Sequence, residues 1–332
     1  MKVLIADKFE KSGIDGLTSR GIEVALAPDA GADGIPAAIH AHKPDVLVVR
    51  STKVPAATVK AAAQAGVRLI VRAGAGVDNI DVGAATGVGI RVCNCPGMNA
   101  VAVAELTMGL LLACDRRIVE QTVDSRRGLW NKKEYGKTGS AGSRGLKGST
   151  LGVVGAGAIG RAVIRRALAF DMHVIVWSRS ISREHAQDLG AQWGGNDTPA
   201  LLALAPRCDF VTIHLPLAPD THGLIGKTFL DSMRTGATMI NTSRGGVIDE
   251  AALREAATSR GIRAGLDVYE VDPGKPATEP GQWQSPTAAH PGFVCTHHVG
   301  ASTEQSQQAI ASEVVRILDI YARSGAVENS IN

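Results

Sequence analysis

The sequence predicts an α/β protein built from two doubly wound parallel sheets. Short apolar runs alternate with helical patterns from the first residues onward, and strands that alternate with helices are typical of a parallel sheet covered on both faces. The alternation stops in a stretch rich in Gly, Lys and Ser and then begins again. The length of 332 residues agrees with about two domains, at roughly 100–200 residues each.

The first alternating block covers about the first hundred residues. Its strands are expected at residues 3–6, 46–49, 69–71 and 90–92. Its helices are expected near residues 12–19, 33–42, 55–65 and 79–86. One long helix without proline is then predicted from about residue 99 to 127, and the Gly-, Lys- and Ser-rich stretch 130–149 is predicted to be a loop.

The second block repeats the pattern. Its strands are expected at residues 151–154, 173–177, 210–214, 238–241 and 262–267. Its helices are expected near residues 158–170, 182–189, 199–205, 227–232 and 249–259. A proline-rich irregular loop is predicted over 273–293, and a final amphipathic helix is predicted over about 302–322.

The composition excludes several classes of protein. The chain is 45% hydrophobic and 20% charged, which excludes a disordered chain and a membrane bundle. Its 35 basic and 32 acidic residues nearly balance, and the net charge of +3 is too small for a protein that binds nucleic acid or a membrane surface. No apolar run reaches the ~18 residues of a membrane span, and the N-terminal run that ends at Asp7 is too short for a signal peptide. We therefore expect a soluble, cytoplasmic protein.

The five cysteines do not have the spacing of a zinc site, and we expect no metal. Most of them lie in apolar runs, so they are interpreted as small buried thiols in a reducing compartment. They are Cys93, Cys95, Cys114, Cys208 and Cys295.

A glycine fingerprint follows the strand predicted at 151–154. The run Gly155-Ala156-Gly157-Ala158-Ile159-Gly160 has the G-x-G-x-x-G spacing and opens a predicted helix. In such a turn the first glycine permits the tight bend, the second lets a pyrophosphate approach the backbone, and the third lets helix pack on strand. The N–H groups at the start of the helix then face the phosphates. This pattern predicts a dinucleotide site.

The next predicted strand ends in Ser178-Arg179-Ser180. An NAD site usually has Asp or Glu about here, where the carboxylate binds the ribose 2′-hydroxyl. Here the two serines can donate hydrogen bonds and Arg179 supplies a cation suited to a 2′-phosphate. The coenzyme is therefore NAD(P), with NADP favoured over NAD. In the alternative, Arg179 is an exposed loop residue and NAD binds through other groups.

Three polar clusters lie at the ends of later strands, where open α/β sheets bind their ligands. They are Asn241-Thr242-Ser243-Arg244-Gly245-Gly246, Asp267-Val268-Tyr269-Glu270-Val271-Asp272-Pro273 and Thr296-His297-His298-Val299-Gly300-Ala301-Ser302-Thr303. Hydride transfer to a 2-keto acid needs a cation for the carboxylate, an acid/base at the carbonyl oxygen and a carboxylate beside that base. The clusters offer all three.

With these motifs, the chain resembles the D-isomer-specific 2-hydroxyacid dehydrogenase family over essentially its whole length. The resemblance implies that Arg244, Asp272 and His298 are catalytic, where Asp272 stands in place of the family's usual Glu. It makes His297 a neighbour of the base. It also implies that the coenzyme contacts Ala158, Ile159, Leu215, Pro216, Thr221, Thr242 and Gly300, and that Asp267 faces the nicotinamide carboxamide.

Within the family, several segments are most similar to the 3-phosphoglycerate dehydrogenase branch, which acts in serine biosynthesis. These segments are residues 49–53, 71–79, 94–99 and 300–305. The resemblance implies a substrate cleft lined by Arg50, Ser51, Arg72, Gly74 and Ala75, where a phosphorylated substrate would explain the arginines. In the alternative, these arginines only pin loops together.

The family fold also implies the domain order. Residues 1–98 and 299–332 would form a discontinuous, flavodoxin-like substrate domain, and residues 99–298 would form the NAD(P)-binding Rossmann domain. The helix after residue 99 and the following loop would supply the contact of a homodimer. The regulatory module of longer relatives is expected to be absent.

Two other functions stay open. The Trp177-Ser178-Arg179-Ser180 run is similar to the NADPH-dependent glyoxylate/hydroxypyruvate reductase branch of the same family. A dinucleotide-sensing co-repressor is the alternative from a different class. Such a protein could dispense with Arg244 or His298, and this chain retains both.

Overall fold

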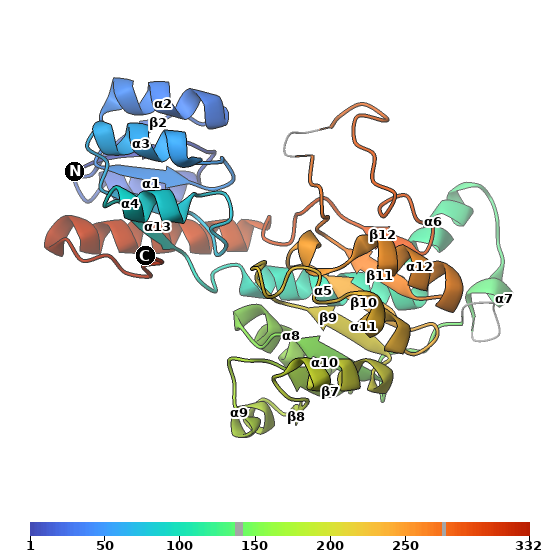
Figure 1. The fold of residues 1–332 in the computed structure, drawn as a ribbon. Helices are drawn as coiled ribbons and strands as arrows, with labels where there is room; N and C mark the ends of the chain where they lie inside the picture. Colours follow the sequence, from blue (N-terminus) through green and yellow to red (C-terminus); the bar gives the residue numbers. More distant parts are fainter. Residues whose placement is uncertain (137–141, 274–276) are drawn as a thin grey trace. The chain divides into compact units, whose positions relative to one another are not determined.

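The computed structural model describes residues 1–136, 142–273 and 277–332, and these divide into two compact units. The first unit joins Met1–Asn99 to Ala301–Asn332, and the second is Ala100–Gly300 (Figure 1). Each contains a parallel sheet with helices on both faces, so the predicted fold class is confirmed, including the discontinuous first domain. Parts of the loops predicted over 130–149 and 273–293 lie outside the described residues.

The first unit is built on a five-stranded sheet in the order β2-β1-β3-β4-β5. The strands are β1 (Lys2–Ile5), β2 (Glu23–Leu26), β3 (Val46–Val49), β4 (Leu69–Arg72) and β5 (Arg91–Asn94). The helices are α1 (Lys11–Thr18), α2 (Gly31–His42), α3 (Ala56–Gln64), α4 (Val82–Gly87) and α13 (Glu304–Ser324). All strand pairs are parallel.

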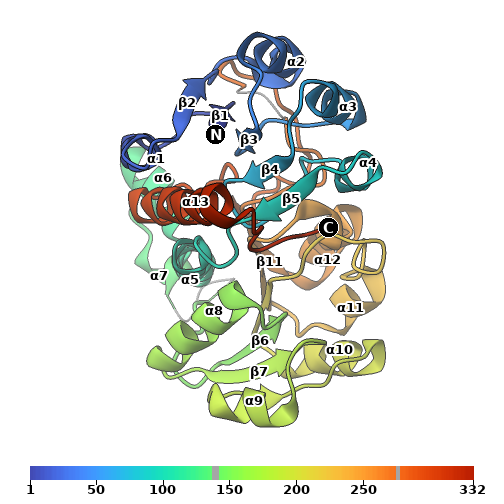
Figure 2. The ribbon, with the colours of Figure 1, turned by 90° about the vertical axis from the view of Figure 1, so that its left-hand side faces the viewer.

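Alternate strand residues in this sheet face opposite sides and feed two separate cores. Val46 and Val48 pack with α1 and α13, whereas Leu47 and Val49 pack with α2, α3 and α4. Figure 2 shows these two groups of helices on opposite faces. The chain's last helix is held by close contact with α1, where a Cβ added to Gly16 would lie 3.1 Å from Val315 Cγ2.

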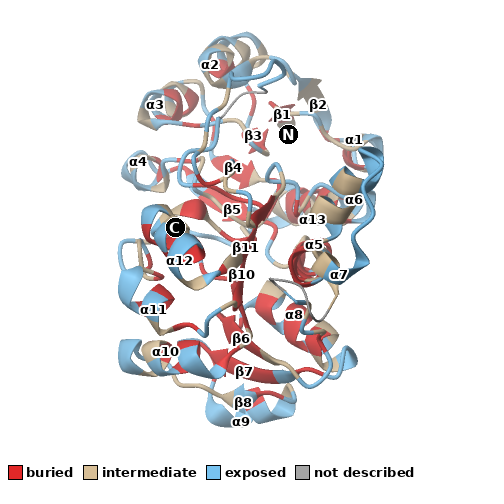
Figure 3. Ribbon diagram, turned by 90° about the vertical axis from the view of Figure 1, so that its right-hand side faces the viewer, coloured by how far each residue is buried: buried red, intermediate tan, exposed pale blue. Residues whose placement is uncertain are grey.

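The second unit is built on a seven-stranded parallel sheet in the order β12-β11-β10-β9-β6-β7-β8. The strands are β6 (Thr150–Val154), β7 (His173–Trp177), β8 (Gln192–Trp193), β9 (Phe210–Ile213), β10 (Thr238–Asn241), β11 (Arg263–Leu266) and β12 (Phe293–Cys295). The helices are α5 (Ala100–Arg116), α6 (Ile118–Arg126), α7 (Lys132–Tyr135), α8 (Ala158–Ala169), α9 (Arg183–Asp188), α10 (Thr198–Leu204), α11 (Lys227–Ser232) and α12 (Glu250–Arg260), with 3-10 turns η1 (Ala205–Arg207) and η2 (Gly245–Val247). Apart from the short edge strand β8, its strands are mostly buried (Figure 3), because helices cover both faces.

The prediction of one long helix over 99–127 is wrong. The helix ends at Arg116, and Arg117 adopts a left-handed conformation with φ of 50° before α6 begins. The Arg117 guanidinium lies 2.9 Å from the Glu134 carboxylate and 4.7 Å from the centre of the Tyr135 ring. These contacts with α7, which itself lies inside the predicted loop 130–149, hold the break.

Four of the five thiols are free and buried, as expected, whereas Cys295 is half-buried. Burial raises the pKa of Cys114 to about 12, so this thiol stays protonated and unreactive near neutral pH. No helix in the described ranges is long and apolar enough to cross a membrane.

Candidate active site

The glycine fingerprint forms the turn between β6 and α8. Gly155 has φ of 103°, and a Cβ there would lie 2.4 Å from the carbonyl oxygen of His214. A Cβ at Gly160 would lie 2.0 Å from the carbonyl oxygen of Gly155, so only glycine lets helix and turn pack this closely. The turn therefore has the tight geometry that the sequence predicts.

The middle glycine leaves room for a ligand. Gly157 is the N-cap of α8, and a Cβ there would meet no heavy atom of the described residues within 4 Å. The first N–H groups of any helix lack intrahelical acceptors and attract anions. The open space and the helix start together fit the pyrophosphate of a dinucleotide, with Ala158 and Ile159 supplying early backbone N–H groups.

The loop after β7 lies beside this turn. The hydroxyl of Ser178 accepts hydrogen bonds from the N–H of Ala156 at 3.4 Å and of Ser180 at 3.2 Å. These bonds tie the loop to the glycine turn and leave Arg179 between the two serines. The Arg179 guanidinium forms an ion pair with Asp220, which lowers the pKa of that carboxyl group.

Asp220 belongs to the loop after β9, on the other side of β6. The buried hydroxyl of Thr221 fixes this loop, donating to the Pro216 carbonyl at 2.6 Å and accepting from the Ala218 N–H at 2.8 Å. Leu215 packs by the glycine turn, since its Cδ2 would lie 3.1 Å from a Cβ at Gly155. These positions are compatible with the predicted coenzyme contacts.

His214, at the start of the same loop, is excluded as an acid/base. Its imidazole is buried, and Nε2 lies 3.0 Å from the Thr212 hydroxyl. Burial lowers the pKa of His214 to about 3, so the ring stays neutral at physiological pH.

Arg244 follows β10. Its guanidinium donates a 2.7 Å hydrogen bond to the Ser243 carbonyl, and the side-chain amide of Asn241 donates to the Arg244 carbonyl at 2.9 Å. The next residue must be glycine, because a Cβ at Gly245 would lie 1.9 Å from the carbonyl carbon of Tyr269. The loop that carries Arg244 therefore packs directly against the backbone of Tyr269, just beyond the end of β11. Thr242, predicted to contact the coenzyme, is buried with its hydroxyl 2.9 Å from that of Thr107.

Asp267, just past β11, organises the turn that carries His298. Its buried carboxylate accepts hydrogen bonds from the Thr296 hydroxyl at 2.6 Å and from the N–H groups of Val299 and Gly300 at 2.9 Å. The N–H of His298 donates to the Asp267 carbonyl at 2.8 Å. His298 itself has φ of 54°, an unusual conformation for a residue other than glycine. The network holds this strained residue at the strand end.

His298 and Asp272 lie in direct contact. The Nδ1 of His298 is 2.8 Å from Oδ2 of Asp272, and the two side chains are 51% and 39% exposed. Because the carboxylate accepts the Nδ1 proton, Nε2 is left for a ligand. Both residues line a pocket of about 760 Å³ together with His297, Tyr269 and Trp283. The rings of Tyr269 and Trp283 meet edge to face with centres 4.9 Å apart, which gives this pocket an aromatic wall.

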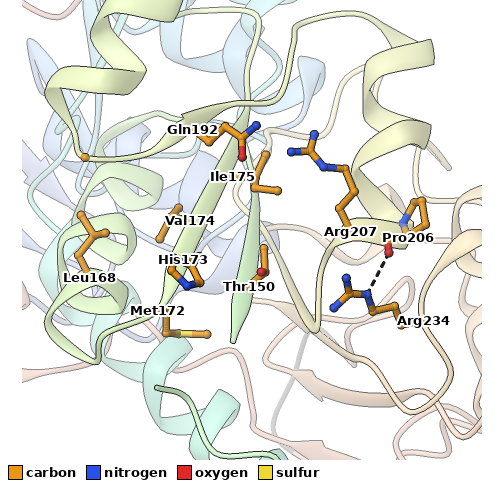
Figure 4. Close-up of a pocket in the computed structure, with 11 residues that line it drawn as sticks. Thr150, Leu168, Met172, His173, Val174, Ile175, Gln192, Pro206, Arg207 and Arg234 are labelled. Atoms are coloured by element: carbon orange, nitrogen blue, oxygen red, sulfur yellow. Dashed lines mark hydrogen bonds between the residues drawn. The ribbon is translucent and has the colours of Figure 1, made fainter. Parts of the chain in front are cut away.

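A second pocket, of about 580 Å³, lies at the amino ends of the strands, opposite the carboxyl ends that carry His298 and Asp272 (Figure 4). Its lining includes Thr150 and His173, the first residues of β6 and β7, and the exposed Arg207. Ligands of open α/β sheets bind at the carboxyl ends of the strands, so this pocket is not the candidate site.

The predicted substrate residues belong to the first unit. The carboxylate of Asp7 accepts hydrogen bonds from the Arg50 N–H at 2.6 Å and from the Ser51 hydroxyl at 3.0 Å, and so shapes that loop. The Arg72 guanidinium lies over Gly74, where a Cβ would be only 1.4 Å from Nη1. The carbonyl of Ala75, in the same loop, accepts a hydrogen bond from the Asn94 side chain.

Comparison with known proteins identifies the family. Residues 108–300 match the model of the D-isomer specific 2-hydroxyacid dehydrogenase NAD binding domain. The chain belongs to the D-isomer-specific 2-hydroxyacid dehydrogenase family. This confirms the resemblance found in the sequence.

Two curated relatives within the family carry different names. The D-3-phosphoglycerate dehydrogenase of Methanocaldococcus jannaschii is 38% identical over 336 aligned positions, which cover 100% of this chain and 59% of that protein. The hydroxypyruvate reductase of Thermotoga maritima is 41% identical over 274 positions, which cover 82% of each chain. This chain thus spans about three fifths of the length of the first relative. Among solved structures, the TT0316 protein of Thermus thermophilus has a TM-score of 0.84 and 31% identity over the full length of both chains.

Sequence reasoning missed three residues of these sites. The sequence shows Asp7 as the end of an apolar run, and its position after a buried first strand is the signal for a loop-shaping carboxylate. Asp220 and Trp283 carry no such signal, because each meets its partner only in the folded chain.

Proposed function

We propose that this member of the family is an NAD(P)-dependent D-2-hydroxyacid dehydrogenase that transfers a hydride between the coenzyme and a small 2-hydroxy or 2-keto acid. The observation that carries the proposal is the 2.8 Å pair of His298 and Asp272, which lines a pocket with an aromatic wall. The pair stands in the same unit as the glycine turn and Arg244. Proton transfer, substrate anchoring and coenzyme binding are thus assigned to separate strand ends of one sheet.

The chemistry follows from the side chains. A bound NAD(P) supplies the hydride for reduction of the 2-keto acid and accepts it in the reverse direction. During reduction, His298 donates the Nε2 proton to the keto oxygen while Asp272 stabilises the imidazolium through Nδ1. In the oxidising direction, neutral His298 takes the proton of the hydroxyl group. Arg244 binds the substrate carboxylate and stabilises the charge that develops on the carbonyl oxygen.

Asp272→Asn should lower kcat for reduction of the 2-keto acid, because the neutral amide removes the negative charge that accepts the Nδ1 proton of His298 and orients the ring. Steady-state kinetics of wild type and variant measure the loss. An unchanged kcat would refute the functional pairing of the two side chains.

The proposed substrate is 3-phosphohydroxypyruvate in the reducing direction and 3-phosphoglycerate in the oxidising direction. Support comes from the first unit, where Arg50 follows β3, Arg72 is the last residue of the neighbouring β4, and both are half-buried. Guanidinium groups bind phosphate through charge-assisted, often bidentate hydrogen bonds. Relatives named D-3-phosphoglycerate dehydrogenase match the full length of this chain, which agrees with the same substrate class.

Arg50→Ala and Arg72→Ala should raise KM for phosphohydroxypyruvate far more than KM for hydroxypyruvate, because only the first substrate offers a phosphate. Steady-state kinetics with both substrates measure the difference. Arg68→Ala is the matched control, since this exposed arginine precedes β4 at the opposite end from Arg72. Equal effects on the two substrates would show that the arginines are structural.

The second candidate is an NADPH-dependent hydroxypyruvate or glyoxylate reductase. It is favoured by the Ser178-Arg179-Ser180 loop and by the 41% identity to a relative named hydroxypyruvate reductase. In that case the unphosphorylated acids would have the higher kcat/KM, and the arginine variants would change KM for both substrate types alike.

For the coenzyme we propose NADP. Ser178 stands where a carboxylate would repel a 2′-phosphate, and Arg179 lies between two serines beside the glycine turn. Hydrogen bonds to charged groups contribute about 1.5–3 kcal/mol, which corresponds to roughly 10–150-fold in affinity.

The kcat/KM for NADPH should therefore exceed that for NADH by at least about tenfold. Arg179→Ala should remove most of the preference, and Ser178→Asp should reverse it by restoring a carboxylate at the ribose. Parallel assays with both coenzymes test this. A wild-type preference for NADH of tenfold would show that other residues recognise the ribose.

We also propose a homodimer. Large apolar side chains are exposed on α6 and in the residues after it, and an exposed cluster of this kind is typical of a protein contact surface. These side chains are Ile118, Val119, Val123, Leu129 and Trp130, the last of which is 88% exposed. Sedimentation should give the mass of two chains.

A further inference from the structure

The ion pair between Arg179 and Asp220 joins two loops across the glycine turn. Arg179 follows β7 and Asp220 follows β9, and both strands are neighbours of β6, which carries the fingerprint. The two side chains are 50% and 59% exposed, so the pair lies at the surface, within reach of a ligand.

The backbone holds both partners in place. Asp220 precedes the buried Thr221, and the Thr221 N–H donates to the Ala218 carbonyl at 3.0 Å in a tight turn. On the other side, the hydrogen bond from the Ser180 N–H to the Ser178 hydroxyl fixes the bend that contains Arg179. These bonds place the two loops so that the Asp220 carboxylate meets the Arg179 guanidinium.

We infer that Asp220 is a coenzyme-specificity residue, whose carboxylate competes with the 2′-phosphate of NADP for Arg179. This inference rests on the proposed role of Arg179 in the preceding subsection. A phosphate that binds Arg179 must displace the carboxylate and remain near its negative charge. Asp220 thereby limits the preference for NADPH and keeps the site open to NADH, which has no phosphate to be repelled.

The relative strengths of the two contacts with Arg179 agree with this role. An exposed ion pair is weak, because water screens the charges and both side chains lose freedom when they pair. A phosphate carries more charge than a carboxylate and can form bidentate bonds with guanidinium, so it can displace Asp220. Removing the carboxylate should therefore tighten phosphate binding by a moderate factor, about two- to fivefold.

The test is direct binding of two coenzyme fragments to the full chain by calorimetry. Adenosine 2′,5′-bisphosphate and 5′-AMP differ only by the 2′-phosphate. Asp220→Asn should lower the Kd for the bisphosphate about two- to fivefold and leave the Kd for 5′-AMP unchanged. Glu255→Gln is the matched control, because Glu255 is a similarly exposed carboxylate paired with Lys227, and it should change neither Kd.

Arg179→Ala and the double variant separate this inference from the proposed function. If Arg179→Ala weakens bisphosphate binding but Asp220→Asn leaves it unchanged or weakens it, competition by Asp220 is refuted while the role of Arg179 stands. If Arg179→Ala has no effect on bisphosphate binding, both the role of Arg179 and the inference are refuted. In the double variant, the gain from Asp220→Asn should be smaller than in wild type, because no guanidinium is left to compete for.

Discussion

His298→Ala should lower kcat for 2-keto acid reduction by about 10²–10⁴-fold, the usual contribution of a positioned acid/base. The variant removes the imidazole that pairs with Asp272, and with it the Nε2 proton donor. The Kd for the coenzyme should change little, because the imidazole is not part of the glycine turn. Steady-state kinetics and coenzyme titration measure the two effects separately.

His297→Ala is the matched control. His297 is the preceding residue, is exposed and lines the same pocket, but it makes no bond to Asp272. It should lower kcat far less than His298→Ala. If His297→Ala were the more damaging change, the assignment of the acid/base would be wrong.

Arg244→Ala should lower kcat/KM by a similar factor of about 10²–10⁴, because it removes both the anchor of the substrate carboxylate and a stabilising charge at the carbonyl oxygen. Arg244→Lys should recover only part of the loss, since a lysine cannot form the bidentate contact of a guanidinium. Kinetics with the preferred 2-keto acid measure both variants.

Arg207→Ala controls for the loss of any arginine from this unit. Arg207 is exposed and lines the pocket at the amino ends of β6 and β7, away from the candidate site (Figure 4). It should leave kcat/KM unchanged. Equal losses in the Arg207 and Arg244 variants would mean that Arg244 has no specific role.

The interior of both sheets could be predicted from the sequence, whereas three strands could not. The unpredicted strands are β2, β8 and β12, and all three stand at the edge of a sheet. β8 has two residues and β12 has three, and β2 is only partly buried. A central strand is covered on both faces and reads as a continuous apolar run, but a short edge strand does not.

The break in the helix at Arg117 could not be predicted from the sequence for a different reason. Nothing in the local sequence stops the helix, since no glycine or proline lies there. The break depends on Glu134 and Tyr135, which meet Arg117 only after the chain folds back. Tertiary contacts thus override the local helical pattern.

The candidate site divides in the same way. The glycine turn could be predicted because each glycine has a local steric reason, as the contacts at Gly155 and Gly160 show. The His298–Asp272 contact joins residues 26 positions apart. Periodicity does not predict this contact, whereas the resemblance to the family does. The Arg179–Asp220 pair spans 41 positions and belongs to no motif, so only the structure reveals it.

The most direct test of the central claim is a panel of 2-keto acids assayed with NADPH and NADH in parallel. The panel includes phosphohydroxypyruvate, hydroxypyruvate, glyoxylate and pyruvate, and oxidation of the coenzyme is followed together with the configuration of the product. We predict turnover of at least one of these acids to a D-2-hydroxy acid where the product is chiral, and loss of that turnover in His298→Ala. Tight coenzyme binding without turnover of any 2-keto acid would contradict the proposed activity and favour a dinucleotide-sensing protein.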